Sequence, residues 1–148
     1  MTKLSVFLLV SLLAPMIACA KEPAKSTTPA GGDSGAALTA QIERGTQLYG
    51  ANCAQCHGDA GQGSPSAPPV VGKDAFPLKP REGAKRDVEF RTAADVFAWA
   101  TVHMPGDAPG TLTTDEYLAI FAFDLTANGV KLAAPLDGPA AQSIVLHP

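Results

Sequence analysis

The sequence predicts a small all-α domain, and three observations support this fold class. A threonine is followed three positions later by an acidic residue at two places, Thr92 with Asp95 and Thr113 with Glu116, and each pair is a capping box that begins a helix. Apolar residues after these starts recur every three or four positions, which is the period of a helix. The 148 residues allow one small domain but not two.

The first 18 residues have the pattern of an export signal. Lys3 gives a positive start, residues 4–17 are apolar but too few to span a bilayer comfortably, and Ala18-Cys19-Ala20 is a small-residue cleavage site. Two endings compete: ordinary cleavage after Ala20, or a lipoprotein signal in which Cys19 becomes the lipid-bearing first residue. We favour the lipoprotein signal, because the residues that follow are typical of a flexible tether.

The rest of the chain divides by composition into three parts. Residues 19–37 are rich in Pro, Ala, Gly, Ser and Thr without apolar periodicity, which predicts a disordered tether. Residues 38–129 hold the expected helices and form the domain, and residues 130–148 form a C-terminal tail. We expect an exported protein on the periplasmic side of a bacterial membrane, anchored there by lipidated Cys19. Ordinary signal cleavage would instead leave it soluble in the periplasm.

Three helices are expected within the domain. The first runs from Thr39 to about Ala51, and its Gly45 is small enough to let another helix cross closely. The second follows the capping box at residue 92 and is stopped by Pro105, and the third runs from the box at residue 113 to Asn128-Gly129. Glycines and prolines between residues 57 and 72 predict a loop there.

The two cysteines of the domain stand in the run Cys53-Ala54-Gln55-Cys56-His57. This is C-x-x-C-H, the attachment motif of a c-type haem. Two thiols one turn apart can add to the two vinyl groups of a haem, and the adjacent imidazole then lies beneath the iron. The motif predicts one covalently bound haem c, tethered by Cys53 and Cys56, with His57 as an iron ligand.

Three other functions of the segment Cys53 to His57 explain its residues less completely than haem attachment does. A zinc site needs four ligands, and the only further imidazoles are the isolated His103 and His147. A thioredoxin-like redox pair expects a preceding strand and a βαβ pattern, and no such strand is evident. A structural disulfide suits an oxidising compartment but leaves the adjacent His57 unexplained.

A second axial ligand follows from the positions of the methionines. Met1 and Met16 precede the expected cleavage site, which leaves Met104. Because the residue before a proline is disfavoured in a helix, Met104 should be extended, with its sulfur free to point at the iron. His103 is the rival ligand, but a packed or surface histidine is expected at its place on the helix. His147 lies in the tail, where we expect it to be exposed.

The sequence resembles the class I cytochromes c in the order and spacing of its motifs, over about residues 38 to 129. The resemblance rests on Gly45-x-x-Leu48-Tyr49, Cys53 to Gly58, Pro68 to Gly72, Met104-Pro105 and a terminal helix with Tyr and Phe. It implies a small cytochrome c fold wrapped around one haem, in which the first and last helices cross near Gly45. It also implies that Pro69 offers its carbonyl to the ring N–H of His57, which would fix the tautomer.

The run from Met104 to Tyr117 is also similar to cytochrome c domains that are attached to quinoprotein alcohol dehydrogenases or serve them. The resemblance implies a one-electron Fe(III)/Fe(II) carrier rather than an enzyme, because both axial positions of the iron are filled. Its partners would be redox proteins, a dehydrogenase as donor and an oxidase or reductase as acceptor. If Met104 does not ligate, the open iron would suit a haem enzyme or a gas-binding sensor.

Charge is unevenly distributed along the domain. Residues 73–91 hold six basic against four acidic side chains, a net charge of +2, whereas residues 92–148 hold one basic against six acidic, a net charge of −5. Two interpretations of the basic segment are open: it orients the domain on an acidic partner surface, or it is an ordinary solvated loop, since its four acids dilute the field and salt screens it; the solvated loop is favoured. The formal net charge of −3 and the absence of a dense Lys and Arg cluster argue against nucleic-acid binding.

Overall fold

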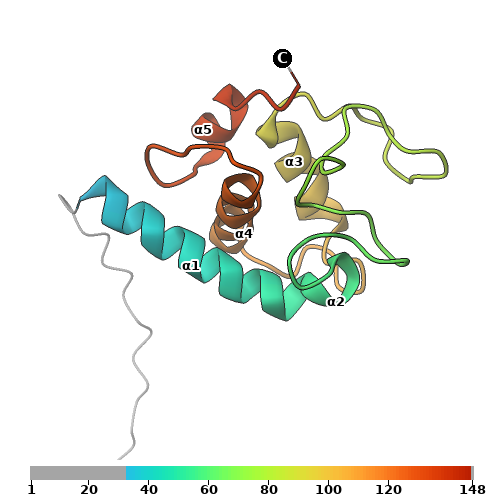
Figure 1. Cartoon of the computed structure of the whole chain (residues 1–148), viewed down its shortest axis with the longest axis horizontal. Coiled ribbons are helices and arrows are strands. Elements are labelled where there is room, and N and C mark those ends of the chain that lie inside the picture. The colour runs from blue at the N-terminus through green and yellow to red at the C-terminus, as the bar shows by residue number, and fades with distance from the viewer. Residues whose placement is uncertain (1–32, 148) are drawn as a thin grey trace, which may run out of the picture. The chain divides into compact units, whose positions relative to one another are not determined.

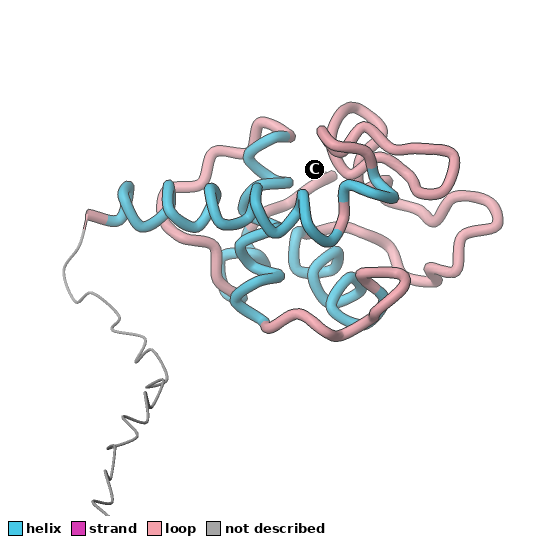
Figure 2. The backbone as a smooth tube through the Cα atoms, turned by 90° about the horizontal axis from the view of Figure 1, so that it is seen from below, coloured by secondary structure: helices cyan, strands magenta, loops and turns pink. Residues whose placement is uncertain are grey.

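The computed structural model describes residues 33–147, so the expected signal peptide, Cys19 and most of the expected tether lie outside the described residues. The described part contains five helices, which are α1 (Ser34–Asn52), α2 (Ala54–His57), α3 (Ala93–His103), α4 (Thr114–Ala127) and α5 (Gly138–Ser143) (Figure 1). Figure 2 shows helices and loops and no strand in the described residues. Their β-structure is limited to one isolated bridge, between Thr92 and Val145. The all-α fold class is confirmed for this part of the chain.

Helix α1 begins at Ser34, earlier than the expected start at Thr39. Asp33 caps it, because its carboxylate accepts the backbone N–H of Gly35 at 3.1 Å. The prediction of a disordered tether is therefore wrong for residues 34–37, which are helical. Alanine favours a helix and the cap satisfies a backbone donor. The first turn showed no apolar period because its residues face solvent.

The two capping boxes begin α3 and α4 as predicted. In α3, the carboxylate of Asp95 accepts the N–H of Thr92 at 2.7 Å, and the N–H of Asp95 donates to the Thr92 hydroxyl at 3.3 Å. The same reciprocal pair joins Thr113 and Glu116 in α4. Helix α4 ends as expected, with Asn128 as its cap.

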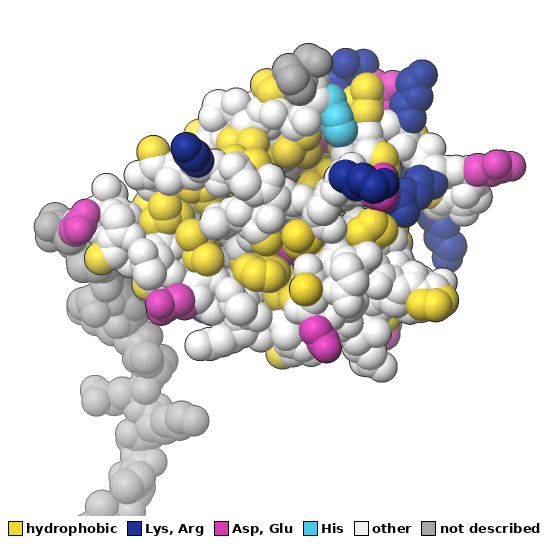
Figure 3. Space-filling view, viewed as in Figure 1, with side chains coloured by type: hydrophobic (Ala, Val, Ile, Leu, Met, Phe, Trp, Pro, Cys, Tyr) yellow, Lys and Arg dark blue, Asp and Glu magenta, His cyan; other side chains and the backbone are white. Residues whose placement is uncertain are grey.

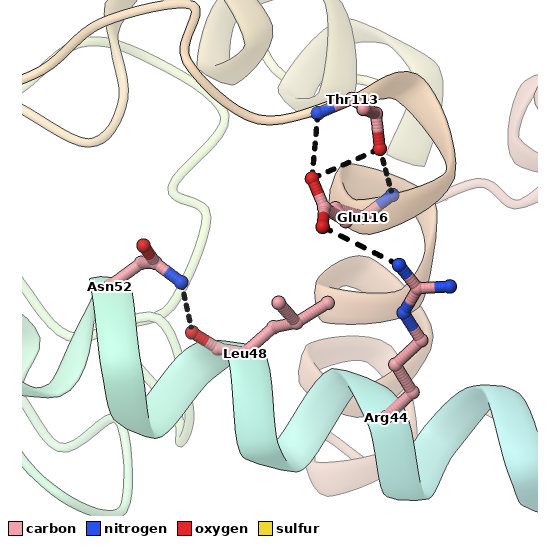
Figure 4. A network of polar contacts seen from close by, with 5 residues as sticks. All are labelled: Arg44, Leu48, Asn52, Thr113 and Glu116. Carbon is pink, nitrogen blue, oxygen red and sulfur yellow. Dashed lines mark hydrogen bonds and ion pairs between the residues drawn. The ribbon is translucent and has the colours of Figure 1, made fainter. Parts of the chain in front are cut away.

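The largest contact between helices is that of α1 with α4. In Figure 1, α4 is viewed nearly along its axis where it crosses α1. A Cβ atom on Gly45 would lie 1.9 Å from the carbonyl oxygen of Ala119, so only glycine allows this approach. The predicted crossing near Gly45 is confirmed. At the start of α4, Arg44 forms a 3.4 Å ion pair with Glu116, which links α1 to the capping box (Figure 4).

The C-terminal residues pack onto the helices. Leu136 is only 2% exposed, and its backbone is paired with the side-chain amide of Gln41 in α1: Leu136 donates its N–H at 2.7 Å and accepts from Nε2 at 2.9 Å. The remaining core is made by apolar side chains of α3, α4 and the loops around them. Its larger members are Phe76, Phe90, Val96, Leu118, Phe121 and Leu125. No helix within residues 33–147 is both long and apolar enough to cross a membrane.

Candidate functional site

Cys53 lies where α1 ends and α2 begins. Its φ of −122° interrupts the helix for one residue, while its carbonyl oxygen accepts the backbone N–H groups of Cys56 at 3.1 Å and His57 at 2.9 Å. The three residues of the C-x-x-C-H motif therefore share one turn, which we call the attachment turn (residues 53–57). Both thiols are free, with Cys53 half-buried and Cys56 exposed. Two free thiols on one turn suit two covalent bonds to a single ligand.

The ring of His57 is oriented by a backbone carbonyl. Its Nδ1 atom lies 2.7 Å from the carbonyl oxygen of Pro68. A carbonyl can only accept, so Nδ1 carries the proton and the other ring nitrogen, Nε2, keeps its lone pair. That is the tautomer a metal-ligating histidine needs, and such an outer bond holds the ring in position.

The prediction that Pro69 supplies this carbonyl is wrong by one residue, since the acceptor is Pro68. The reason lies in the direction of the next peptide. The N–H of Val70 donates to the carbonyl oxygen of Gly61 at 2.8 Å, and in a trans peptide the Pro69 carbonyl points the opposite way. Successive prolines keep the chain extended, so their carbonyls face different directions and only the first meets His57.

The loop of residues 58–72 is held against the attachment turn. The hydroxyl of Tyr49 donates to Gly58 O at 2.8 Å, the N–H of Gly63 to His57 O at 2.7 Å, and the hydroxyl of Ser64 to Cys56 O at 2.5 Å. Gly63 has a φ of 85°, and a Cβ atom there would lie 2.7 Å from the nitrogen of Pro69. Glycine at this position lets the loop fold back far enough to bring its prolines to the histidine.

Asn128 is a structural residue of this site that the sequence predictions treated only as a helix end. Its side-chain NH₂ donates to the carbonyl oxygen of Val70 at 2.8 Å, and its side-chain oxygen accepts the N–H of Gly72 at 2.9 Å. These bonds fasten the far end of the 58–72 loop to α4. No local pattern could have shown them, because the partners lie more than 50 residues apart in the sequence.

Met104 caps α3 and is extended, with φ of −119° and ψ of 154°, which confirms the conformation predicted from Pro105. Its N–H donates to Ala100 O at 2.8 Å, and its carbonyl oxygen accepts the hydroxyl of Tyr117 from α4. The side chain is partly buried against the core. The backbone is thus held by both α3 and α4, while the thioether sulfur forms no hydrogen bond within residues 33–147. Met104 and the attachment turn belong to separate elements.

His103 and His147 are both engaged with other protein groups. The His103 ring lies on Trp99, with ring centroids 4.5 Å apart and planes 9° from parallel. Its Nδ1 is 2.7 Å from the Trp99 carbonyl oxygen, one turn earlier in α3. His147 is exposed, as expected, and its Nε2 lies 2.7 Å from the carbonyl oxygen of Phe76.

Asp124 of α4 is a buried acid that acts electrostatically on the attachment turn. This residue is 4% exposed, and burial raises the pKa of its carboxyl well above the usual range. Burial, followed by the charge of Asp124, also raises the pKa of the Tyr49 hydroxyl and raises that of the Cys53 thiol to about 12. In the sequence Asp124 counted only toward the acidic charge of residues 92–148. A signal was present, because it follows Ile120 and Phe121 at helical spacing on the apolar side.

The residues of this site fit a covalently attached haem. The attachment turn offers two free thiols and an imidazole that is already oriented with its Nε2 available. The end of α3 adds a thioether whose backbone is held in an extended conformation. Thiols for two thioether bonds, an imidazole and a thioether are the donors that a c-type haem uses.

An all-helical domain with this attachment turn defines a c-type cytochrome. The family model described as "Cytochrome C oxidase, cbb3-type, subunit III" matches residues 40–123, more than half of the chain, and the chain belongs to this family. Its fold is similar to that of a solved structure, the sulfane dehydrogenase SoxCD from Paracoccus pantotrophus, at 29% sequence identity and a TM-score of 0.54. The similarity covers 71% of this chain and 53% of that chain, so this chain spans about half the length of that one. No curated protein matches the sequence.

Proposed function

We propose that this protein is a one-electron carrier, with a single haem c attached through Cys53 and Cys56 and ligated by His57. Its membership of a cytochrome c family supports electron transfer. The observation that carries the proposal is the bond from His57 Nδ1 to Pro68 O, which leaves Nε2 as the nitrogen available to iron. When bound, the haem supplies an iron that cycles between the ferric and ferrous states.

Met104 is the proposed second axial ligand. Its extended backbone and the Tyr117 bond to its carbonyl support this role, because they hold the residue at the end of α3 through its main chain alone. Histidine and methionine together raise the potential of the iron. With both axial positions filled no substrate needs to reach the metal, so the domain carries electrons and does not catalyse a reaction.

The proposed partners are redox proteins, a dehydrogenase as donor and an oxidase or reductase as acceptor. The family description names a subunit of an oxidase, and the similar solved structure is a sulfane dehydrogenase, which supports partners of these kinds. The proposed location is the periplasmic side of a bacterial membrane, with lipid on Cys19. Labelling with palmitate tests the anchor: wild type should be labelled and Cys19→Ser should not, and an unlabelled wild type excludes the lipid.

A haem stain after denaturing electrophoresis tests the function directly. A band at the mass of the protein is expected from cells with a working cytochrome c maturation system, and Cys53→Ala with Cys56→Ala should abolish it. The purified protein should then be reduced and reoxidised reversibly by one electron. A colourless wild-type band contradicts the proposal. A stained protein that binds carbon monoxide without any substitution favours the sensor or enzyme alternative.

A further inference from the structure

Asp124 is a buried carboxyl group that has no role in the proposed attachment or ligation of the haem. Its side chain is 4% exposed, and its Oδ1 atom has no hydrogen-bond partner within residues 33–147. Burying a carboxylate without a partner is unfavourable, so such a group is rare unless its surroundings or its protonation state provide compensation. Perturbed acids of this kind are enriched at functional sites.

Helix α4 places Asp124 beside the attachment turn. The preceding residue, Phe123, packs on the ring of Tyr49 in α1, with centroids 5.1 Å apart. Cys53 follows Tyr49 by one helical turn, and its N–H donates to the carbonyl oxygen of Tyr49 at 2.8 Å. The carboxylate of Asp124 is near enough to act electrostatically on both residues.

The next turn of α4 approaches the other wall of the site. Asn128, one turn after Asp124, is bonded to Val70 and Gly72 at the end of the 58–72 loop, which orients His57 through Pro68. On α4, Asp124 therefore stands between Phe123, which contacts the end of α1, and Asn128, which holds this loop.

The other titratable groups near Asp124 do not compete with it for a proton. The Tyr49 hydroxyl donates to Gly58 O, and its raised pKa keeps it protonated. The Cys53 thiol is consumed by the thioether bond, and Asp59, which also acts on Tyr49, is exposed. Burial is the cause of the raised pKa of Asp124, and no lysine or arginine in the described part of the chain offsets it.

We propose that Asp124 binds one proton when the haem iron is reduced and releases it when the iron is oxidised. This inference rests on the proposed function. In the reductive direction one electron from a redox partner converts ferric to ferrous iron, and one proton from solvent converts the Asp124 carboxylate to the neutral acid. The site then gains one negative and one positive charge, so its net charge is unchanged. A buried site of low polarity favours this compensation.

The coupling makes the reduction potential depend on pH. The ferric form has the more positive iron and holds the carboxylate ionised, so the pKa of Asp124 is lower in the ferric than in the ferrous protein. Between these two values the potential should fall as pH rises, by up to about 59 mV per tenfold change in proton concentration for a one-electron couple. The window lies above the ordinary carboxyl range because burial raises both values.

The experiment is a pH series of spectroelectrochemical titrations on the full, haem-loaded protein. The variants are Asp124→Asn and, as a matched control, Asp115→Asn, an exposed acid in the first turn of the same helix. Wild type and the control should show the same pH-dependent window, and Asp124→Asn should lose it. The haem propionates are present in all three proteins, so the difference between them isolates Asp124.

Infrared spectroscopy provides a second measurement on wild type alone. Within the window, the reduced-minus-oxidised difference spectrum should contain the C=O band of a carboxylic acid, and Asp124→Asn should lack it. Parallel pH profiles in wild type and Asp124→Asn, or a wild-type potential without the window, overturn the inference. Failure of haem attachment or of reversible one-electron reduction instead overturns the proposed function, so the two failures are distinguishable.

Discussion

The backbone of Met104 is fixed from two directions, by Ala100 within α3 and by the hydroxyl of Tyr117 in α4. We expect Met104→Ala to keep its haem, because both tethering cysteines are unchanged, and to lose the weak long-wavelength band that marks methionine bound to ferric iron. The vacated position should then bind carbon monoxide in the ferrous protein. Absorption spectra before and after addition of carbon monoxide measure both changes.

The matched control is His103→Ala, which removes the rival ligand next in sequence. Because the His103 ring is held on Trp99 at the surface of α3, this variant should retain the band and exclude carbon monoxide. A band that survives in Met104→Ala and disappears in His103→Ala would assign the ligand to His103 instead.

Asp124 should also make stability depend on pH. A carboxyl whose pKa is higher in the folded than in the unfolded protein binds protons more tightly when folded, so the free energy of unfolding falls as pH rises from about 4 through the folded value. Asp124→Asn does not ionise, so we expect its stability relative to wild type to be greater at pH 7 than at pH 4. Thermal unfolding of the ferric protein at both pH values measures it.

Asp115→Asn serves as the control here as well, because this acid lies exposed in the first turn of the same helix. Its melting temperature should stay close to that of wild type at both pH values. An Asp124→Asn variant whose stability relative to wild type is lower at pH 7 than at pH 4 would show that the ionised carboxylate is stabilised in the folded protein.

At the scale of elements, the crossing of α1 and α4 depends on one missing side chain. A Cβ atom on Gly45 would meet the Ala119 carbonyl oxygen at 1.9 Å, and a backbone atom cannot rotate away. Gly45→Ala should therefore separate the helices and lower the free energy of unfolding by roughly 3 kcal/mol. Denaturant unfolding followed by circular dichroism measures the loss.

Gly50→Ala is the control on the same helix. A Cβ atom there would have nothing within 4 Å, so the substitution should stabilise the protein by about 0.5 to 1 kcal/mol through helix propensity alone. If Gly45→Ala behaved like Gly50→Ala, the close approach of α1 and α4 would not be needed for stability.

Elements whose signals are local could be predicted from the sequence. The capping boxes of α3 and α4, the extended Met104 and the shared turn of the C-x-x-C-H motif each depend on residues within a few positions of one another. Features that depend on distant partners could not be predicted. The choice of Pro68 over Pro69 depends on a bond between Gly61 and Val70, and the bonds of Asn128 join it to Val70 and Gly72, more than 50 positions away.

At the scale of the whole molecule, fewer basic side chains of residues 73–91 are available to a partner than the sequence indicates. Arg86 is 8% exposed, bonds to the carbonyl oxygens of residues 77, 78 and 88, and stacks on Phe90, so it has a structural role. Lys73 and Arg91 form ion pairs with acidic neighbours, and Arg81 bonds to a backbone carbonyl. Basic side chains still gather at the upper right of the face shown in Figure 3.

Exposed Lys79 and Lys85 form no ion pair within the described residues, so any steering charge of the segment rests mainly on them. The electron-transfer rate with an acidic partner should fall as salt rises, and Lys79→Glu with Lys85→Glu should lower it further without moving the reduction potential. Stopped-flow kinetics over a range of ionic strength measure the rate. The control is Lys131→Glu, an exposed lysine outside the segment. Lys131→Glu changes the charge by −2 and the double variant by −4, so an effect of Lys131→Glu about half that of the double variant would leave net charge, not a docking surface, as the cause.

The pairing of Gln41 with Leu136 joins two points 95 residues apart. Closing a loop of this length costs about 4 kcal/mol of chain entropy. The two hydrogen bonds that help to offset this cost can form only when both residues have been synthesised. On a polypeptide made from its N-terminus, the turn with Cys53 and Cys56 is finished long before Leu136 is added. The cysteines can therefore meet their prosthetic group on an open chain, and the last segment to be synthesised fastens the first helix behind them.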